Sequence, residues 1–143
     1  MFVETRDESR RFFLHVWRKM SAKRRLEPLE TLVAQIIEEH AEYHAILSVP
    51  EQALDRDYTS AEGATNPFLH MGLHVALQEQ LQSDRPPGII ELYRQLRSNL
   101  SDDVHRTEHM IMGCLADALW QASRSGGVSN ERDYLDCIRK YIA

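Results

Sequence analysis

The chain has 143 residues, a length typical of one domain and sufficient to bury a hydrophobic core. Hydrophobic residues make up 43% and charged residues 27%, a globular composition that excludes extensive disorder. The formal net charge is −5, so no basic excess favours a general nucleic-acid binder or an anionic membrane surface. We expect a single domain over residues 1–143.

The N-terminal half predicts two long helices followed by a loop. A capping-box pattern begins at Thr5, so a first helix is expected over about 6–22. A proline suited to the first turn opens a second helix, which is expected over 28–47. Residues 49–65 have weak periodicity, which indicates a long loop with room for one short turn of helix.

The C-terminal half continues the helical pattern. Asn66 with the proline after it predicts a third helix to about residue 83, and two prolines then precede a short helix from residue 89. A fifth helix is expected over about 101–124, and Asn130 caps a last amphipathic one. Period-two alternation is absent over any useful length. The pattern predicts an all-α helical bundle of about four long helices plus one or two short ones.

Histidine is the unusual residue in this composition. The chain has seven, and six of them fall into three pairs spaced by four, where chance predicts about 0.3 such pairs. Each pair lies on a different predicted long helix, and residues four apart share one face of a helix. The three pairs are His40/His44, His70/His74 and His105/His109.

All three pairs share their helix faces with apolar residues, so we expect the six imidazoles to point inward. Buried imidazoles must satisfy their ring nitrogens, and a bound cation would do so without clustering positive charge. Glu108 lies at the edge of the same face as His105 and His109. It is a candidate ligand or bridge, and its alternative role is to accept a hydrogen bond from a ligating imidazole. His15 lies off its helix's apolar stripe and is expected at the surface.

An imidazole-dominated donor set favours a transition metal and disfavours magnesium and calcium. We expect iron or zinc first, with nickel, manganese or copper as alternatives, held as one ion or as a pair. The resulting hypothesis is a metal-binding helical protein. Its first alternative is a non-enzymatic helical interaction protein with a structural or pH-responsive histidine core. A third is a metal-dependent hydrolase or oxidase, and whether the protein is an enzyme stays open.

Hydropathy and cysteine content bear on the location of the protein and on its partners. The N-terminal residues lack an apolar signal core, and no apolar run is long enough to span a membrane. Two cysteines, Cys114 and Cys137, do not make a disulfide framework, and Cys114 is expected to be an inert structural thiol. We therefore expect a cytoplasmic protein that binds neither nucleic acid nor membrane. The amphipathic last helix leaves a homodimer open, and no protein partner is indicated.

Three segments carry a resemblance to a known family. The segments Asn66–His74 (NPFLHMGLH), Asp84–Ile89 (DRPPGI) and His105–Met112 (HRTEHMIM) resemble small bacterial proteins, found mainly in proteobacteria, that are grouped as a domain of unknown function. This resemblance covers most of the chain and implies no activity. The inward histidine pairs are also similar to hemerythrin-like metal-binding bundles, although only Glu108 comes close to the carboxylates that those bundles carry.

Overall fold

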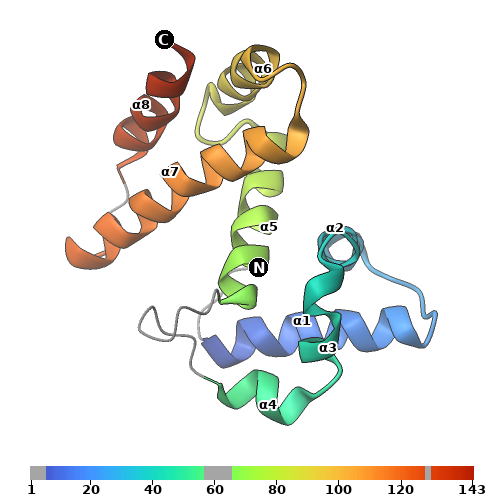
Figure 1. Cartoon of the computed structure of the whole chain (residues 1–143). Helices are drawn as coiled ribbons and strands as arrows, with labels where there is room; N and C mark the ends of the chain where they lie inside the picture. The colour runs from blue at the N-terminus through green and yellow to red at the C-terminus, as the bar shows by residue number, and fades with distance from the viewer. Residues whose placement is uncertain (1–5, 57–65, 128–129) are drawn as a thin grey trace. The chain divides into compact units, whose positions relative to one another are not determined.

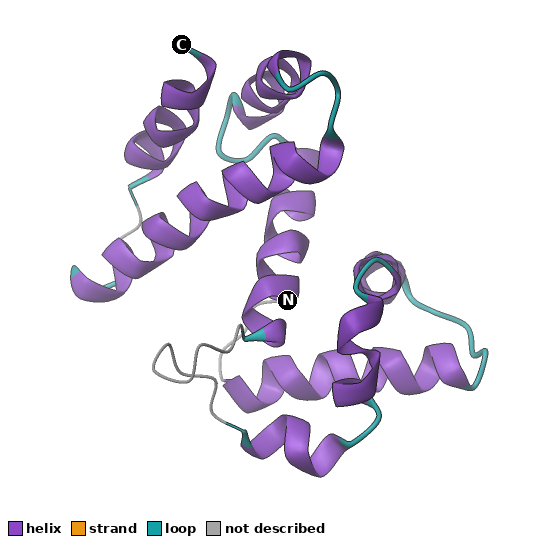
Figure 2. Cartoon of the chain, in the orientation of Figure 1, coloured by secondary structure: helices purple, strands orange, loops and turns teal. Residues whose placement is uncertain are grey.

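The computed structural model describes residues 6–56, 66–127 and 130–143 (Figure 1). No strand occurs in these ranges, so the prediction of an all-α protein is confirmed (Figure 2). The elements in chain order are α1 (Arg6–Ser21), α2 (Pro28–Glu38), the 3-10 helix η1 (Ala41–Tyr43), α3 (His44–Leu47), α4 (Pro50–Asp55), α5 (Pro67–Ser83), α6 (Ile89–Asn99), α7 (Val104–Arg124) and α8 (Glu131–Ile142).

Most helix starts lie where their capping residues predict them. The Asn66 side-chain oxygen accepts hydrogen bonds from the N–H groups of Phe68 and Leu69, at 3.0 and 3.2 Å. Asn130 caps α8 in the same way. Helix α7 starts later than the expected residue 101, because Ser101 and Asp102 have positive φ and Asp103 is the capping residue. Such caps act because the first N–H groups of a helix have no partner within it. The capping box expected at Thr5 and residues 57–65 of the expected loop lie outside the described residues.

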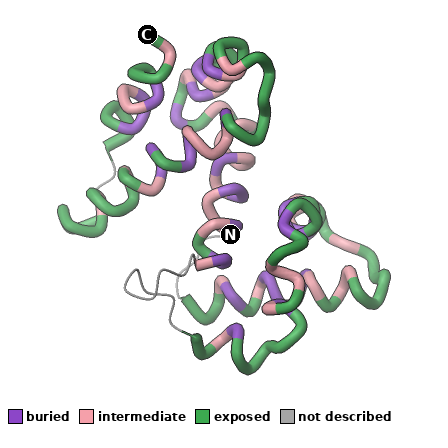
Figure 3. The backbone as a smooth tube through the Cα atoms, viewed as in Figure 1, coloured by how far each residue is buried: buried purple, intermediate pink, exposed green. Residues whose placement is uncertain are grey.

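Contacts within the chain divide it into two compact units, Met1–Val75 and Ala76–Ala143, with the boundary inside α5. The expectation of a single domain over 1–143 stays a prediction. In the N-terminal unit, buried apolar residues of α1, α2, α3, α4 and the start of α5 form one core. Its fully buried members include Phe13, Val16, Val33, Ile37, Leu47 and Met71. Figure 3 colours the buried positions along the backbone purple.

A buried arginine attaches the short helix α4 to α1. The Arg10 guanidinium, only 2% exposed, donates through Nη1 to the carbonyl oxygens of Ala53 and Arg56, at 3.0 and 2.8 Å. It also lies 5.1 Å from the centroid of the Phe68 ring. A buried cation needs such partners, and the carbonyl end of a helix carries partial negative charge. Arg10 therefore holds α4 against α1 beside the start of α5.

A carboxylate joins α1 to the start of α2. Glu30 accepts a hydrogen bond from its own helix start, the Glu27 N–H at 2.8 Å, and another from Lys19 Nζ at 2.7 Å. His15 Nε2 lies 3.1 Å from its other oxygen, so this histidine lies at the surface with a structural partner. The Glu27 N–H, followed by Lys19, lowers the pKa of the Glu30 carboxyl below its ordinary value of 4.5.

Stability should therefore depend on Glu30 at neutral pH and lose that dependence in acid. A carboxyl whose pKa is lowered in the folded state stabilises the fold above its unfolded pKa, and this contribution is lost as the pH falls through the folded pKa. Glu30→Gln should lower Tm at neutral pH, and the difference from the wild type should shrink below about pH 4. Thermal melts across this range test the prediction. A Tm difference that persists unchanged into acid would contradict it.

In the C-terminal unit, α6, α7, α8 and the end of α5 surround a second core. Leu96, Ile111 and Ile138 are fully buried there. The Tyr134 hydroxyl donates to Gln80 Oε1 at 2.7 Å, and burial raises the pKa of this phenol, so it stays protonated. The last helix therefore packs on its own unit.

The turn before α6 is built by Asp84 and Gly88. The Asp84 carboxylate accepts from the N–H groups of Gly88 and Ile90, the latter at 3.1 Å, and so caps the helix from outside. Gly88 has φ +99°, a conformation that a side chain would strain. The segment resembling the known family, DRPPGI, thus has a structural role here.

The two cysteines form a disulfide that joins α7 to α8. Cys114 and Cys137 are bonded, with their Cα atoms 5.8 Å apart. The expectation that Cys114 is an inert thiol is wrong, because the buried faces of two packed helices bring both side chains together. Disulfides persist mainly in oxidising compartments, so the cytoplasmic location stays a prediction. No helix of the described ranges is both long and apolar enough to span a bilayer.

Candidate metal centre

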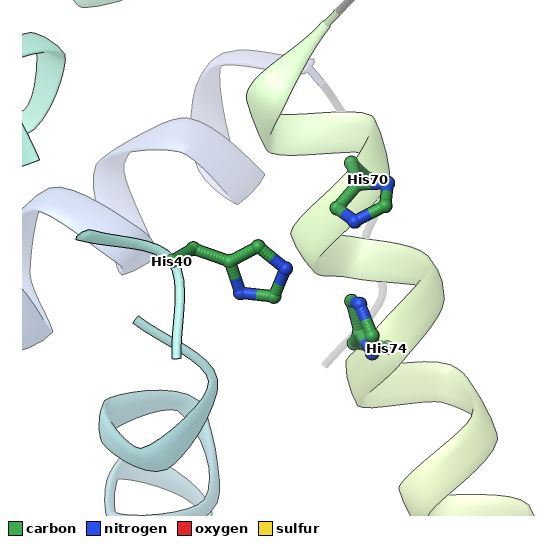
Figure 4. Close-up of side chains that lie close together, drawn as sticks. All are labelled: His40, His70 and His74. Atoms are coloured by element: carbon green, nitrogen blue, oxygen red, sulfur yellow. The ribbon is translucent and has the colours of Figure 1, made fainter. Parts of the chain in front are cut away.

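Three histidines of the N-terminal unit converge. His70 and His74 lie one turn apart on α5, and His40 projects toward them from the segment between α2 and η1 (Figure 4). One ring nitrogen from each histidine lies within 4.8 Å of the others. The ring centroids form a nearly equilateral triangle, with separations of 4.7 Å for His40–His74, 4.9 Å for His70–His74 and 5.0 Å for His40–His70. We call this set the histidine triad.

The position of His40 depends on a helix end that the sequence did not indicate. The expectation of one helix over 28–47 is wrong, because α2 ends at Glu38 and His40 has φ −123° and ψ 61°. His40 Nδ1 bonds the Ile36 carbonyl oxygen at 2.7 Å, and His44 Nε2 bonds that of Ile37 at 2.8 Å. The two imidazoles thus occupy carbonyls that a further helical turn would have used. The chain can leave the helix here without glycine or proline.

The hydrogen bond of His40 also determines which nitrogen can bind a metal. A carbonyl oxygen only accepts, so Nδ1 carries the hydrogen and Nε2 of the neutral ring presents its lone pair. Metal-ligating histidines commonly donate their other N–H to a backbone carbonyl, which fixes both tautomer and ring orientation. His40 therefore has the hydrogen bonding of a ligand.

His44 has a different environment. Its ring packs on Trp17, with centroids 4.6 Å apart, and its Nε2 is bonded to the Ile37 carbonyl. The pair His40/His44 does not share one continuous helix, because η1 lies between the two residues. His44 thus supports the helix end that positions His40, and ligation by His44 itself stays a prediction.

Tyr43 covers one side of the triad. Its ring is parallel to that of His40 at a centroid separation of 5.5 Å, and it lies 6.2 Å from His70. Burial, followed by the charge of Glu42, raises the pKa of the Tyr43 phenol, so the hydroxyl stays protonated at neutral pH. Tyr43 was not among the predicted site residues, and its position between His40 and His44 in the sequence was the available signal.

The triad is largely shielded from solvent, and its donor atoms are all imidazole nitrogens. His40 and His74 are 5% and 3% exposed, and His70 is half-buried. His70 lies in the first turn of α5, where the helix dipole disfavours an imidazolium. Within the described ranges no carboxylate or thiol joins this cluster. The donor set is three imidazoles, which suits zinc, iron, nickel or copper.

The ring positions are close to those that an ion would require. Zinc–imidazole bonds are about 2.0–2.1 Å, so nitrogens on one tetrahedral ion lie about 3.4 Å apart. The triad nitrogens lie within 4.8 Å of one another, so binding such an ion would draw them closer together.

The third histidine pair lies in the C-terminal unit. His105 and His109 are neighbours on α7, with ring centroids 4.0 Å apart, and His105 is exposed. Glu108 Oε1 accepts a hydrogen bond from Gln78 Nε2 at 3.3 Å. The structure thus brings these two imidazoles together on one helix face. Their ligation, and that of Glu108, stay predictions.

Comparison with known proteins gives one match. The sequence model of a domain of unknown function, DUF1841, matches residues 5–140. No curated protein matches the chain, and no solved structure matches it. The match covers the described helices of both units except the last two residues of α8. The likeness to hemerythrin-like bundles stays a prediction.

Proposed function

The chain belongs to the DUF1841 family, and because that family has no assigned function, we propose from the site itself that this protein binds a transition-metal ion through His40, His70 and His74. The observation that carries the proposal is the convergence of three largely buried imidazoles, one ring nitrogen each, within 4.8 Å.

Hydrogen bonding and charge support the same proposal. His40 donates from Nδ1 to a carbonyl and so offers Nε2 to an ion. His70 lies at a helix start, which favours the neutral, metal-binding form. Zinc or iron fits this donor set best, while nickel, copper and manganese are the alternatives.

The number of ligands favours a site with an exchangeable position. Structural zinc sites use four protein ligands, whereas catalytic sites use three and keep one place for water or substrate. Three imidazoles leave such a place, and a bound ion would there lower the pKa of a water molecule. This observation favours metal-assisted hydrolysis or oxidation as a second candidate function.

Metal content of protein without a polyhistidine tag tests the proposal. The chain supplies a matched pair of double variants, because His70/His74 and His105/His109 have the same residues and the same spacing. We expect one ion per chain in the wild type and in His105→Gln/His109→Gln, and none in His70→Gln/His74→Gln. Elemental analysis after incubation with zinc or iron gives the count.

Three results would overturn this assignment. Metal retained by the His70→Gln/His74→Gln variant would place the ion elsewhere, and so would metal lost only from the other variant. If the protein binds none of zinc, iron and manganese, the better hypothesis is an interaction protein with a histidine core. Cytoplasmic location, a homodimer and the absence of nucleic-acid binding remain proposals beside this one.

A further inference from the structure

A second chemically reactive group lies in the C-terminal unit. The Cys114–Cys137 disulfide forms part of the wall of a pocket of about 540 Å³ beside α7 and α8. Cys137 is half-buried, whereas Cys114 is 2% exposed. Both cysteines line this pocket, and Cys137 is the more exposed of the two. The pocket is also lined by Asp117, Asp133, Lys140, Gln121 and Asn130.

We propose that this disulfide is a redox site that exchanges, in the folded protein, with a small thiol carrying an ammonium group. Exchange requires that a thiolate reach one sulfur, and a disulfide on a pocket wall meets that requirement. A disulfide enclosed in a core would react only after unfolding. The proposal is independent of the histidine triad.

The reaction is a sequence of two exchanges. The thiolate of the small molecule attacks Cys137 Sγ, a mixed disulfide forms, and Cys114 leaves as a thiolate that takes up a proton. A second small thiol attacks the mixed disulfide and releases Cys137. Two small thiols are thereby oxidised to one disulfide while the protein gains two electrons and two protons. Lys140 lines the same pocket, and a nearby ammonium stabilises a thiolate.

The charges of the pocket indicate which thiols it favours. Two carboxylates, Asp117 and Asp133, line it against the single ammonium of Lys140. The balance is negative, as is the net charge of −5 for the whole chain. An approaching ammonium is therefore attracted, and a carboxylate is repelled. These groups are exposed, so the expected preference is modest.

Rates of reduction by cysteamine and by 2-mercaptoethanol test the proposal. Free thiols are trapped by alkylation and counted by mass spectrometry, in the folded protein and in the urea-unfolded chain. The reduction rates of the unfolded chain are used to correct for the different intrinsic reactivities of the two thiols. We expect reduction of the folded protein, with a corrected preference for cysteamine of about twofold to fivefold at low ionic strength.

Charge-matched variants isolate the role of the pocket. Asp117→Asn/Asp133→Asn should remove the preference, whereas Asp102→Asn/Asp136→Asn, which changes two carboxylates outside the pocket lining, should keep it. Circular dichroism verifies that each variant is folded. A folded disulfide that resists both thiols overturns the proposal. If the wild type shows no preference for cysteamine, or if both double variants show the same preference, the assigned class of thiol is overturned.

Discussion

His74→Gln should weaken transition-metal binding by more than about 100-fold. Loss of a group that merely orients a ligand typically costs 10–100-fold in affinity, and removal of a ligand itself should cost more. Glutamine keeps a polar side chain of similar size at a position that is 3% exposed, so the fold should tolerate it. Competition with a chromophoric chelator measures the affinity for zinc.

The same variant should lose the stabilisation that metal gives to the folded protein. At a free metal concentration of about 100 times Kd, binding adds about 2.7 kcal/mol, which corresponds to roughly 10 °C in Tm for a chain of this size. The wild type should melt lower in chelator, and His74→Gln should not respond. His15→Gln, which changes an exposed histidine paired with Glu30, should respond as the wild type does. Equal zinc affinity in His74→Gln and the wild type would contradict the site.

Loss of the disulfide should cost about as much stability as loss of the bound metal. The bond joins residues 23 apart, and closing a loop of that size in the unfolded chain corresponds to about 3 kcal/mol. Cys114→Ala/Cys137→Ala should therefore unfold at lower urea concentration than the oxidised wild type. Urea titrations followed by circular dichroism measure the difference.

Reduced wild type is the control that separates the cross-link from the packing of the sulfur atoms. It keeps both side chains and lacks only the bond, so its stability should fall by most of the same amount. The alanine variant should not respond to reductant. A wild-type midpoint that reductant leaves unchanged would contradict the prediction.

Local signals in the sequence predicted much of the fold correctly. Asn66 and Asn130 begin helices because their side chains accept from the N–H groups that follow, an interaction within one turn of chain. The spacing of His70 and His74 likewise placed both rings on one face of α5. Such predictions succeed because the cause and the result lie within a few residues of each other.

The break after Glu38 could not be predicted in this way. It contains neither glycine nor proline, and it depends on imidazoles bonding the carbonyls of Ile36 and Ile37. The ring of His44 is in turn supported by Trp17, a residue of another helix. The spacing of His40 and His44 therefore suggested a shared helix face, although the two residues do not lie on one helix.

The disulfide was missed for a related reason. Cys114 lies on a buried face of α7, and Cys137 lies on α8 beside the buried Ile138. Two cysteines on the apolar faces of consecutive helices were a usable signal. Their pairing, however, required knowing that these two faces pack together.

The position of His40 outside α2 has a consequence for how the N-terminal unit is held together. An ion bound by the triad would tie His40 to His70 and close the intervening chain, which includes α3 and α4, into a ring. It would act as a removable cross-link, much as the disulfide acts as a reducible one between α7 and α8. Each unit would then contain its own cross-link, a metal ion in the N-terminal unit and a disulfide in the C-terminal unit. Chelator should make the N-terminal unit more susceptible to proteolysis, and reductant should make the C-terminal unit more susceptible. Each effect should occur without the other.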